Sequence, residues 1–146
     1  MGGRINYSLQ RLIEERKITR IKPDRKMILK EIQAAEYDLE KAQKSLEDGD
    51  SKWGTIKAYY CMFHSARALL YNVGYREKSH RALLIALREL LVKRGHFPED
   101  LLAIFKNGMD LREEADYASE FSEETANDLI EDAKSFLAKV KSVLKA

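Results

Sequence analysis

Polar side chains that fall on otherwise apolar helical stripes are the residues of this chain best suited to chemistry, because a buried ionisable group costs free energy unless it is paired. His80 falls on the predicted stripe of Leu84 and Leu87. It opens a predicted helix, where free backbone amides suit an anion and the positive helix end disfavours imidazolium. It could bind phosphate or exchange a proton. A neutral histidine hydrogen-bonded inside the core is the competing interpretation.

Arg112 and Asp116 continue a second apolar stripe, that of Phe105 and Met109. The spacing of four residues places a guanidinium and a carboxylate on the same helix face, both turned inward. A permanently charged arginine near a histidine suits the binding of a phosphate or phosphodiester. A structural pair that ties two helices together explains these residues equally well.

Tyr60, His64 and Arg67 share one side of a helix that has almost no face suited to water. A wide apolar stripe through Tyr59 and Met62 covers another side, and small residues fill the rest. We therefore expect protein around this helix, either at the centre of a bundle or at a seam between two subunits. His64 and Arg67 then have a structural or subunit-contact role, or they line a site.

Motifs for other chemistry are absent from the sequence, which contains no glycine-rich phosphate loop, HExxH, CxxC or EF-hand spacing. The three histidines lack the spacing of metal ligands, so neither a metal site nor a cofactor is predicted. The single Cys61 lies mid-helix among aromatic residues and is interpreted as a small packing residue.

The composition, 45% hydrophobic and 34% charged over 146 residues, predicts one domain with a sizeable core. No apolar run could span a membrane and no signal peptide is visible, so a cytoplasmic location is expected by default. Residues 1–30 carry nine Lys or Arg against three acids, whereas residues 110–132 carry ten acids against one arginine. The basic end could contact phosphates and the acidic stretch a basic partner, although solvated helix faces explain both.

Helical periods fill the chain, and no segment shows the alternation of a half-buried strand, which predicts an all-α fold. We expect an up-and-down bundle of four or five helices in residues 23–146, preceded by a basic N-terminal arm with a short helix in residues 1–22. Gly74 is predicted to end one helix in a left-handed conformation, and Ser79 and Ser122 to cap two others. The helices are expected at about 7–16, 24–47, 51–72, 80–94, 98–117 and from 122 onward.

The segments YYCMFHSARALLYNVGYREKSHRALL and LREEADY, in that order, resemble the HEPN family, specifically its small stand-alone prokaryotic branch. The resemblance covers roughly residues 25–143. It implies a four- or five-helix bundle, usually a homodimer, that binds nucleotide or RNA. It also implies frequent pairing with a minimal nucleotidyltransferase in toxin/antitoxin systems. Many members of the family are metal-independent endoribonucleases.

The ribonuclease members resemble one another in an Arg-x(4–6)-His motif near a dimer cleft, and this chain departs from it. Arg112 occupies what looks like the place of the motif arginine, but Tyr117 stands five residues on. Only three residues separate Arg76 from His80. A phenol is a poor general base at neutral pH but can donate a hydrogen bond to phosphate.

Three hypotheses follow. The first is a HEPN module that holds a nucleotide or RNA in a dimer cleft lined by His80, Arg112, Asp116, Tyr117 and Arg76, acting with a nucleotidyltransferase partner. The second is a metal-independent endoribonuclease that uses Arg112 with His80 as acid and base. The third is a structural adaptor whose acidic face docks a basic partner and whose Arg112 is only a brace.

Overall fold

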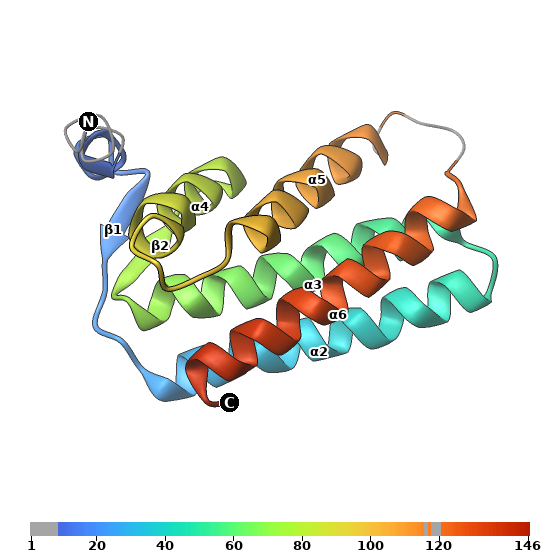
Figure 1. The fold of residues 1–146 in the computed structure, drawn as a ribbon, viewed down its shortest axis with the longest axis horizontal. Coiled ribbons are helices and arrows are strands. Elements are labelled where there is room, and N and C mark those ends of the chain that lie inside the picture. Colours follow the sequence, from blue (N-terminus) through green and yellow to red (C-terminus); the bar gives the residue numbers. More distant parts are fainter. Residues whose placement is uncertain (1–8, 116, 118–120) are drawn as a thin grey trace.

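Two long antiparallel helices, α2 (Arg25–Glu47) and α3 (Ser51–Asn72), form the base of the fold, and the remaining elements pack on them (Figure 1). The computed structural model describes residues 9–115, 117 and 121–146. The predicted all-α bundle is confirmed. In chain order the elements are a helical segment at 9–14, β1 (Ile18–Arg20), α2 (Arg25–Glu47), α3 (Ser51–Asn72), β2 (Tyr75–Glu77), α4 (His80–Leu87), the π-helical η1 (Arg88–Val92), α5 (Glu99–Ala115) and α6 (Glu123–Leu144).

Side-chain caps fix where the helices begin. The carboxylate of Asp50 accepts a hydrogen bond from the Trp53 amide at 3.2 Å, at the start of α3. Ser79 and Ser122 accept from amides three residues on, as predicted. Beyond the end of α3, Gly74 has a φ of +88°, a conformation that glycine adopts without steric cost. The predicted range 51–72 for this helix is therefore confirmed at both ends.

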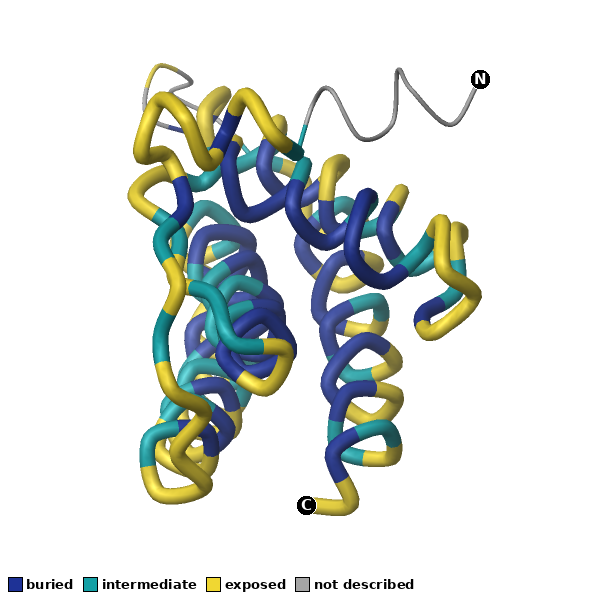
Figure 2. The backbone as a smooth tube through the Cα atoms, turned by 90° about the vertical axis from the view of Figure 1, so that its left-hand side faces the viewer, coloured by how far each residue is buried: buried dark blue, intermediate teal, exposed yellow. Residues whose placement is uncertain are grey.

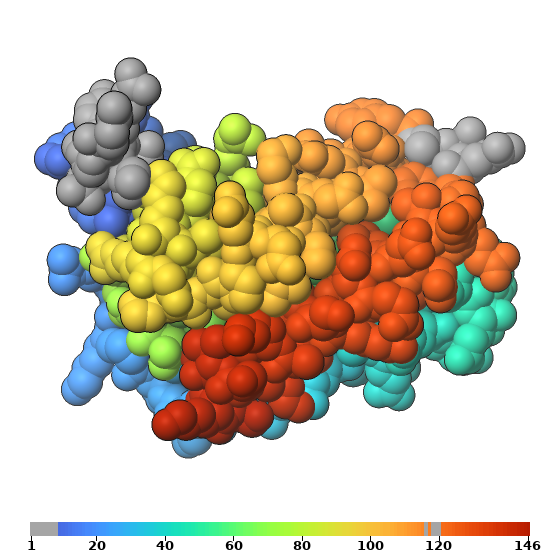
Figure 3. All heavy atoms as spheres, in the orientation of Figure 1, coloured from blue at the N-terminus to red at the C-terminus, as the bar shows by residue number. Residues whose placement is uncertain are grey.

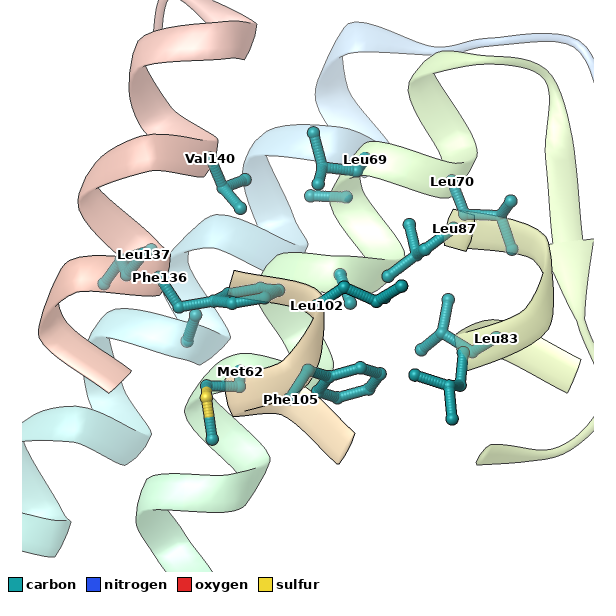
Figure 4. Packing of buried hydrophobic residues seen from close by; sticks show 14 of the residues in the cluster. Met62, Leu69, Leu70, Leu83, Leu87, Leu102, Phe105, Phe136, Leu137 and Val140 are labelled. Atoms are coloured by element: carbon teal, nitrogen blue, oxygen red, sulfur yellow. The ribbon is translucent and has the colours of Figure 1, made fainter. Parts of the chain in front are cut away.

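Helix α3 lies at the centre of the bundle and contacts α2, α4, α5 and α6. Buried residues follow the inner sides of the helices (Figure 2). The close view in Figure 4 shows Met62 of α3 beside Phe105 of α5, with Phe136 of α6 nearby. The expectation that protein surrounds this helix on nearly every side is confirmed, because thirteen of its residues are buried.

Helices α5 and α6 close the bundle on the side seen in Figure 3, where α6 runs diagonally below α5. Gly108 allows α5 to pack closely against α3. A Cβ atom at Gly108 would stand 2.6 Å from Cε of Met62 and 3.4 Å from Cδ1 of Tyr59. The core beneath α5 therefore has little spare room at this point.

A small sheet was not predicted. Strands β1 and β2 pair antiparallel, with Ile18 opposite Glu77, Thr19 opposite Arg76 and Arg20 opposite Tyr75. Each strand has three residues, too few for a period-two pattern to be seen in the sequence. Ile18 is buried in the core, and so is Leu12 of the helical segment before it. This part of the basic arm thus packs on the bundle, while the domain division at residue 22 stays a prediction.

The helix predicted at 80–94 is interrupted, because α4 gives way to the π-helical η1. Glu89, Leu90 and Leu91 of this π-helical turn are consecutive and all buried. The carboxylate of Glu89 lies 3.3 Å from Nη2 of Arg88 and 3.4 Å from Nζ of Lys93. Across the part of the chain that the structure describes, no helix has the length and apolar character needed to cross a membrane.

Candidate functional site

His80 opens α4 and turns its ring against the aromatic side of α3. The ring stacks on Phe63 with centroids 4.4 Å apart, and it lies 5.7 Å from the ring of Tyr59. The hydroxyl of Tyr59 is 2.5 Å from Nδ1 of His80. Since the Ser79 cap fixes the first turn of α4, the imidazole is held from both the backbone and the ring side.

The environment keeps the His80 ring neutral at pH 7. Burial, followed by the positive charges of Arg112 and Arg67, lowers the pKa of His80 below 6.5, against a smaller opposing effect of Glu113. Burial also raises the pKa of Tyr59 far above its ordinary value, so its hydroxyl keeps its proton.

The hydrogen-bond network assigns the tautomer of His80. The protonated hydroxyl of Tyr59 donates to Nδ1, because His80 is its one hydrogen-bond partner within residues 9–115, 117 and 121–146. The ring proton of a neutral imidazole then resides on Nε2. No described residue accepts a hydrogen bond from that nitrogen. The site thus presents a neutral N–H donor.

Arg112 approaches the same aromatic group from the last turn of α5. Its Nη2 donates to the hydroxyl of Tyr60 at 3.2 Å, and its guanidinium carbon lies 5.8 Å from the centroid of that ring. Tyr60 also meets the His80 ring edge-on at 6.2 Å. Among the described residues no carboxylate forms an ion pair with Arg112. The structure thus places the predicted His80 and Arg112 next to the same side chain, that of Tyr60.

Two other predicted ligand-binding residues, Tyr117 and Arg76, do not join this group. Tyr117 follows the end of α5, which stops at Ala115, and 92% of its surface is exposed. Arg76 is exposed in β2, and within the described structure it makes no hydrogen bond or ion pair with His80 or Arg112. Asp116 lies outside the described residues, so its predicted pairing with Arg112 stays a prediction.

His64 and Arg67 lie in an ion-pair network on the adjoining part of α3. Nδ1 of His64 is 2.7 Å from a Glu31 carboxylate oxygen, and its Nε2 is 3.5 Å from Asp38. Arg67 lies 3.1 Å from Glu77 through Nε and 3.5 Å from Glu31 through Nη1. These two residues therefore join α2, α3 and β2 within one chain, which favours the structural interpretation of the pair.

The carboxylates of this network were missed in the sequence. Glu31 and Asp38 are seven residues apart on α2, a spacing that puts both on one helix face and could have revealed them. Glu77 lies two residues before the Ser79 cap of α4, and no spacing in the sequence indicates its role. Burial raises the pKa of Asp38 and of Glu77, opposed chiefly by His64 for Asp38 and by Arg67 for Glu77. Their partners therefore offset part of the cost of burying these carboxylates.

We refer to His80, Tyr59, Tyr60, Phe63 and Arg112 as the aromatic–arginine site. The segments that build it, at the centre of α3, the start of α4 and the end of α5, are those whose order resembles HEPN proteins. The family model described as HEPN domain matches residues 29–143. The chain belongs to the HEPN family. All five residues of the site lie inside the matched range.

Curated HEPN relatives of similar length support the assignment. An Archaeoglobus fulgidus protein named "UPF0332 protein" is 33% identical over 115 residues, covering 77% of this chain and 91% of that protein. A Methanocaldococcus jannaschii protein named "Putative toxin MJ0605" is 33% identical over 125 residues, covering 82% of this chain and 93% of that protein. A second protein of that organism, "Putative toxin MJ0142", is 28% identical over 115 residues, 73% of this chain and 78% of its own.

Proposed function

We propose that this HEPN chain binds the phosphate of a nucleotide or RNA at the aromatic–arginine site. The observation that carries the proposal is the pair of donors around Tyr60: the neutral Nε2–H of His80 and the guanidinium of Arg112, which has no carboxylate partner in the described structure. An arginine without an ion-pair partner among the described residues suits a phosphate, which accepts charge-assisted hydrogen bonds. The rings of Tyr60 and Phe63 supply faces on which a base can stack.

We further propose that the module acts in a toxin/antitoxin-like system with a minimal nucleotidyltransferase partner and as a homodimer. Two relatives carry the word toxin in their names, and the resemblance noted in the sequence implies both the partner and the dimer. Tyr60, Phe63 and Leu111 are only half-buried, so a second subunit or a partner protein has apolar surface to cover beside the site.

A ribonuclease is the second candidate, favoured by the contact of both His80 and Arg112 with the same tyrosine, Tyr60. In-line attack by a ribose hydroxyl needs a base to remove its proton. The hydrogen bond from Tyr59 leaves Nε2 protonated, so His80 must change tautomer before Nε2 can accept that proton. This requirement favours binding over catalysis.

The adaptor hypothesis assigns Arg112 a purely structural role, for which its hydrogen bond to Tyr60 is the supporting contact. Loss of that side chain would then lower stability and leave every ligand interaction unchanged. The experiment that separates the three functions must therefore measure binding, cleavage and stability on the same variants.

The test incubates the purified protein with labelled single-stranded and structured RNA in chelator, and follows cleavage on gels and binding by fluorescence anisotropy. Arg112→Ala and His80→Ala are compared with Lys139→Ala, a charge-matched control at an exposed position of α6. We expect binding without cleavage, weakened about 10-fold or more in the two site variants, as loss of a charge-assisted hydrogen bond implies. The control should bind normally.

Two outcomes would contradict the binding module. Cleavage products that disappear in both site variants would establish a metal-independent ribonuclease. RNA binding that is unchanged in both variants, together with a lower melting temperature of Arg112→Ala, would leave Arg112 as a brace and favour the adaptor.

A further inference from the structure

A separate pocket of about 610 Å³ lies where the end of α3, the small sheet and the segment after η1 meet. Its lining includes the side chains of Arg20, Arg94 and His96, and it contains no acidic residue. Tyr75 and Leu90 contribute an aromatic ring and an apolar wall. A volume of this size suits a nucleotide-sized ligand.

The two arginines of this pocket lack carboxylate partners in the described part of the chain. Within residues 9–115, 117 and 121–146, no carboxylate forms an ion pair with Arg20, Arg94 or His96. The guanidinium carbon of Arg20 instead lies 5.5 Å from the ring centroid of Tyr75. A cation–π contact orients a guanidinium without using its N–H groups as an ion pair would. Arg20 therefore keeps donors for a ligand.

The basic side chains of the pocket do not serve to cap the C-terminus of α3. Positive side chains near a helix C-terminus commonly hydrogen-bond its last carbonyls. Here the backbone does so: the Val73 amide donates to the carbonyls of Leu69 and Leu70, and the Gly74 amide donates to that of Tyr71 at 3.0 Å. In the described structure, none of Arg20, Arg94 and His96 donates a hydrogen bond to an α3 carbonyl.

We infer that this pocket is a second phosphate site, which binds the phosphate group of a free nucleotide or of an RNA strand. Two guanidinium groups can donate hydrogen bonds to phosphate oxygens, and the base can stack on the ring of Tyr75 beside the apolar wall. Gly74 lies eleven residues beyond Phe63, a distance of about 16 Å along a helix axis. The site is thus distinct from the aromatic–arginine site, and the inference does not rest on that proposed function.

The experiment titrates the ¹⁵N-labelled protein with ATP and, separately, with a short single-stranded RNA, and follows backbone amide signals. Gly74 and Gly95 report on the pocket, whereas amides around His80 report on the aromatic–arginine site. Arg20→Gln and Arg94→Gln each remove one exposed cation from the pocket, and Lys139→Gln is the matched control on α6. Melting curves establish that each variant is folded.

We expect saturable shifts at Gly74 and Gly95 with at least one of the two probes. Affinity should weaken about 10-fold or more in both arginine variants and stay unchanged in the control. Saturation by ATP alone would identify a free nucleotide, and saturation by RNA alone a strand. For RNA, each lost contact should also reduce the slope of log K against log salt by about 0.7.

The inference is overturned by the absence of shifts at Gly74 and Gly95 with both probes, even where amides near His80 respond. That second result would support the proposed function and refute the pocket. Equal weakening in Lys139→Gln also overturns it, because the binding would then follow overall charge.

Discussion

Replacing Tyr59 with phenylalanine removes one hydroxyl from the aromatic–arginine site and leaves the buried ring in place. That hydroxyl lies 2.5 Å from Nδ1 of His80. A lost hydrogen bond of this kind costs about 0.5–1.5 kcal/mol net, and the half-buried Nδ1 left without a donor brings the total to about 1–2 kcal/mol. For a chain of this size, each kcal/mol lowers the melting temperature by about 2–4 °C. We therefore expect a decrease of about 2–8 °C.

The more specific readout of Tyr59→Phe is the tautomer of His80. Long-range ¹H–¹⁵N NMR distinguishes the two ring nitrogens, and the chain has only three histidines to assign. In the unmodified protein above pH 7, we expect the proton of His80 on Nε2. In Tyr59→Phe, we expect a mixture of tautomers, because the donor that fixed Nδ1 as an acceptor is gone.

Tyr37→Phe provides the matched control, since it deletes the same atom from a ring that is 59% exposed. Its stability should change by less than about 0.5 kcal/mol, and the His80 signals should not change. The reasoning is refuted if His80 of the unmodified protein carries its proton on Nδ1. An unchanged melting temperature and tautomer in Tyr59→Phe would refute it as well.

Four further predictions concern other groups. In Arg112→Gln the pKa of His80 should rise towards 6.5, because one of the charges that lower it is removed; proton NMR titration measures this, and an unchanged titration would contradict it. Because the pKa of His80 is lowered in the folded state, His80 stabilises the fold above about pH 6.5, and this stabilisation is lost as the pH falls through the folded pKa. Urea unfolding of the unmodified protein and of His80→Asn at several pH values measures this loss. Burial raises the pKa of the Cys61 thiol to about 12, so iodoacetamide should alkylate it only after unfolding. Gly108→Ala should change the stability by less than about 1 kcal/mol in urea, because the added methyl displaces only the flexible end of Met62 and the gain in helix propensity offsets that displacement.

The sequence was most informative where local chemistry decides local structure. The Asp50 carboxylate and the positive φ of Gly74 bound α3, and both signals are readable without tertiary contacts. The central position of α3, with thirteen of its 22 residues buried, follows from its composition in the same way. These features depend on residues close in the chain, which a single sequence displays directly.

Features that depend on contacts between residues far apart in the sequence were harder to predict. Pairing of Ile18 with Glu77 depends on the path of the intervening helices, and the π-helical turn at Arg88–Val92 has no period that composition reveals. The packing of antiparallel helices allows Arg112 to approach His80 but does not require it. The inward placement of Tyr117 was not found, because α5 ends before that residue.

The two arginines beside the aromatic group have different partners, and the difference separates their roles. Arg67 lies 5.4 Å from the Phe63 ring and pairs with Glu31 and Glu77. Arg112 lies over Tyr60 and has a hydroxyl as its hydrogen-bond partner. Removing Arg67 leaves half-buried carboxylates without their cation, which costs mainly stability. Removing Arg112 leaves no carboxylate unpaired among the described residues. If Arg112 binds the phosphate as proposed, the cost of removing it should therefore appear mainly in ligand binding.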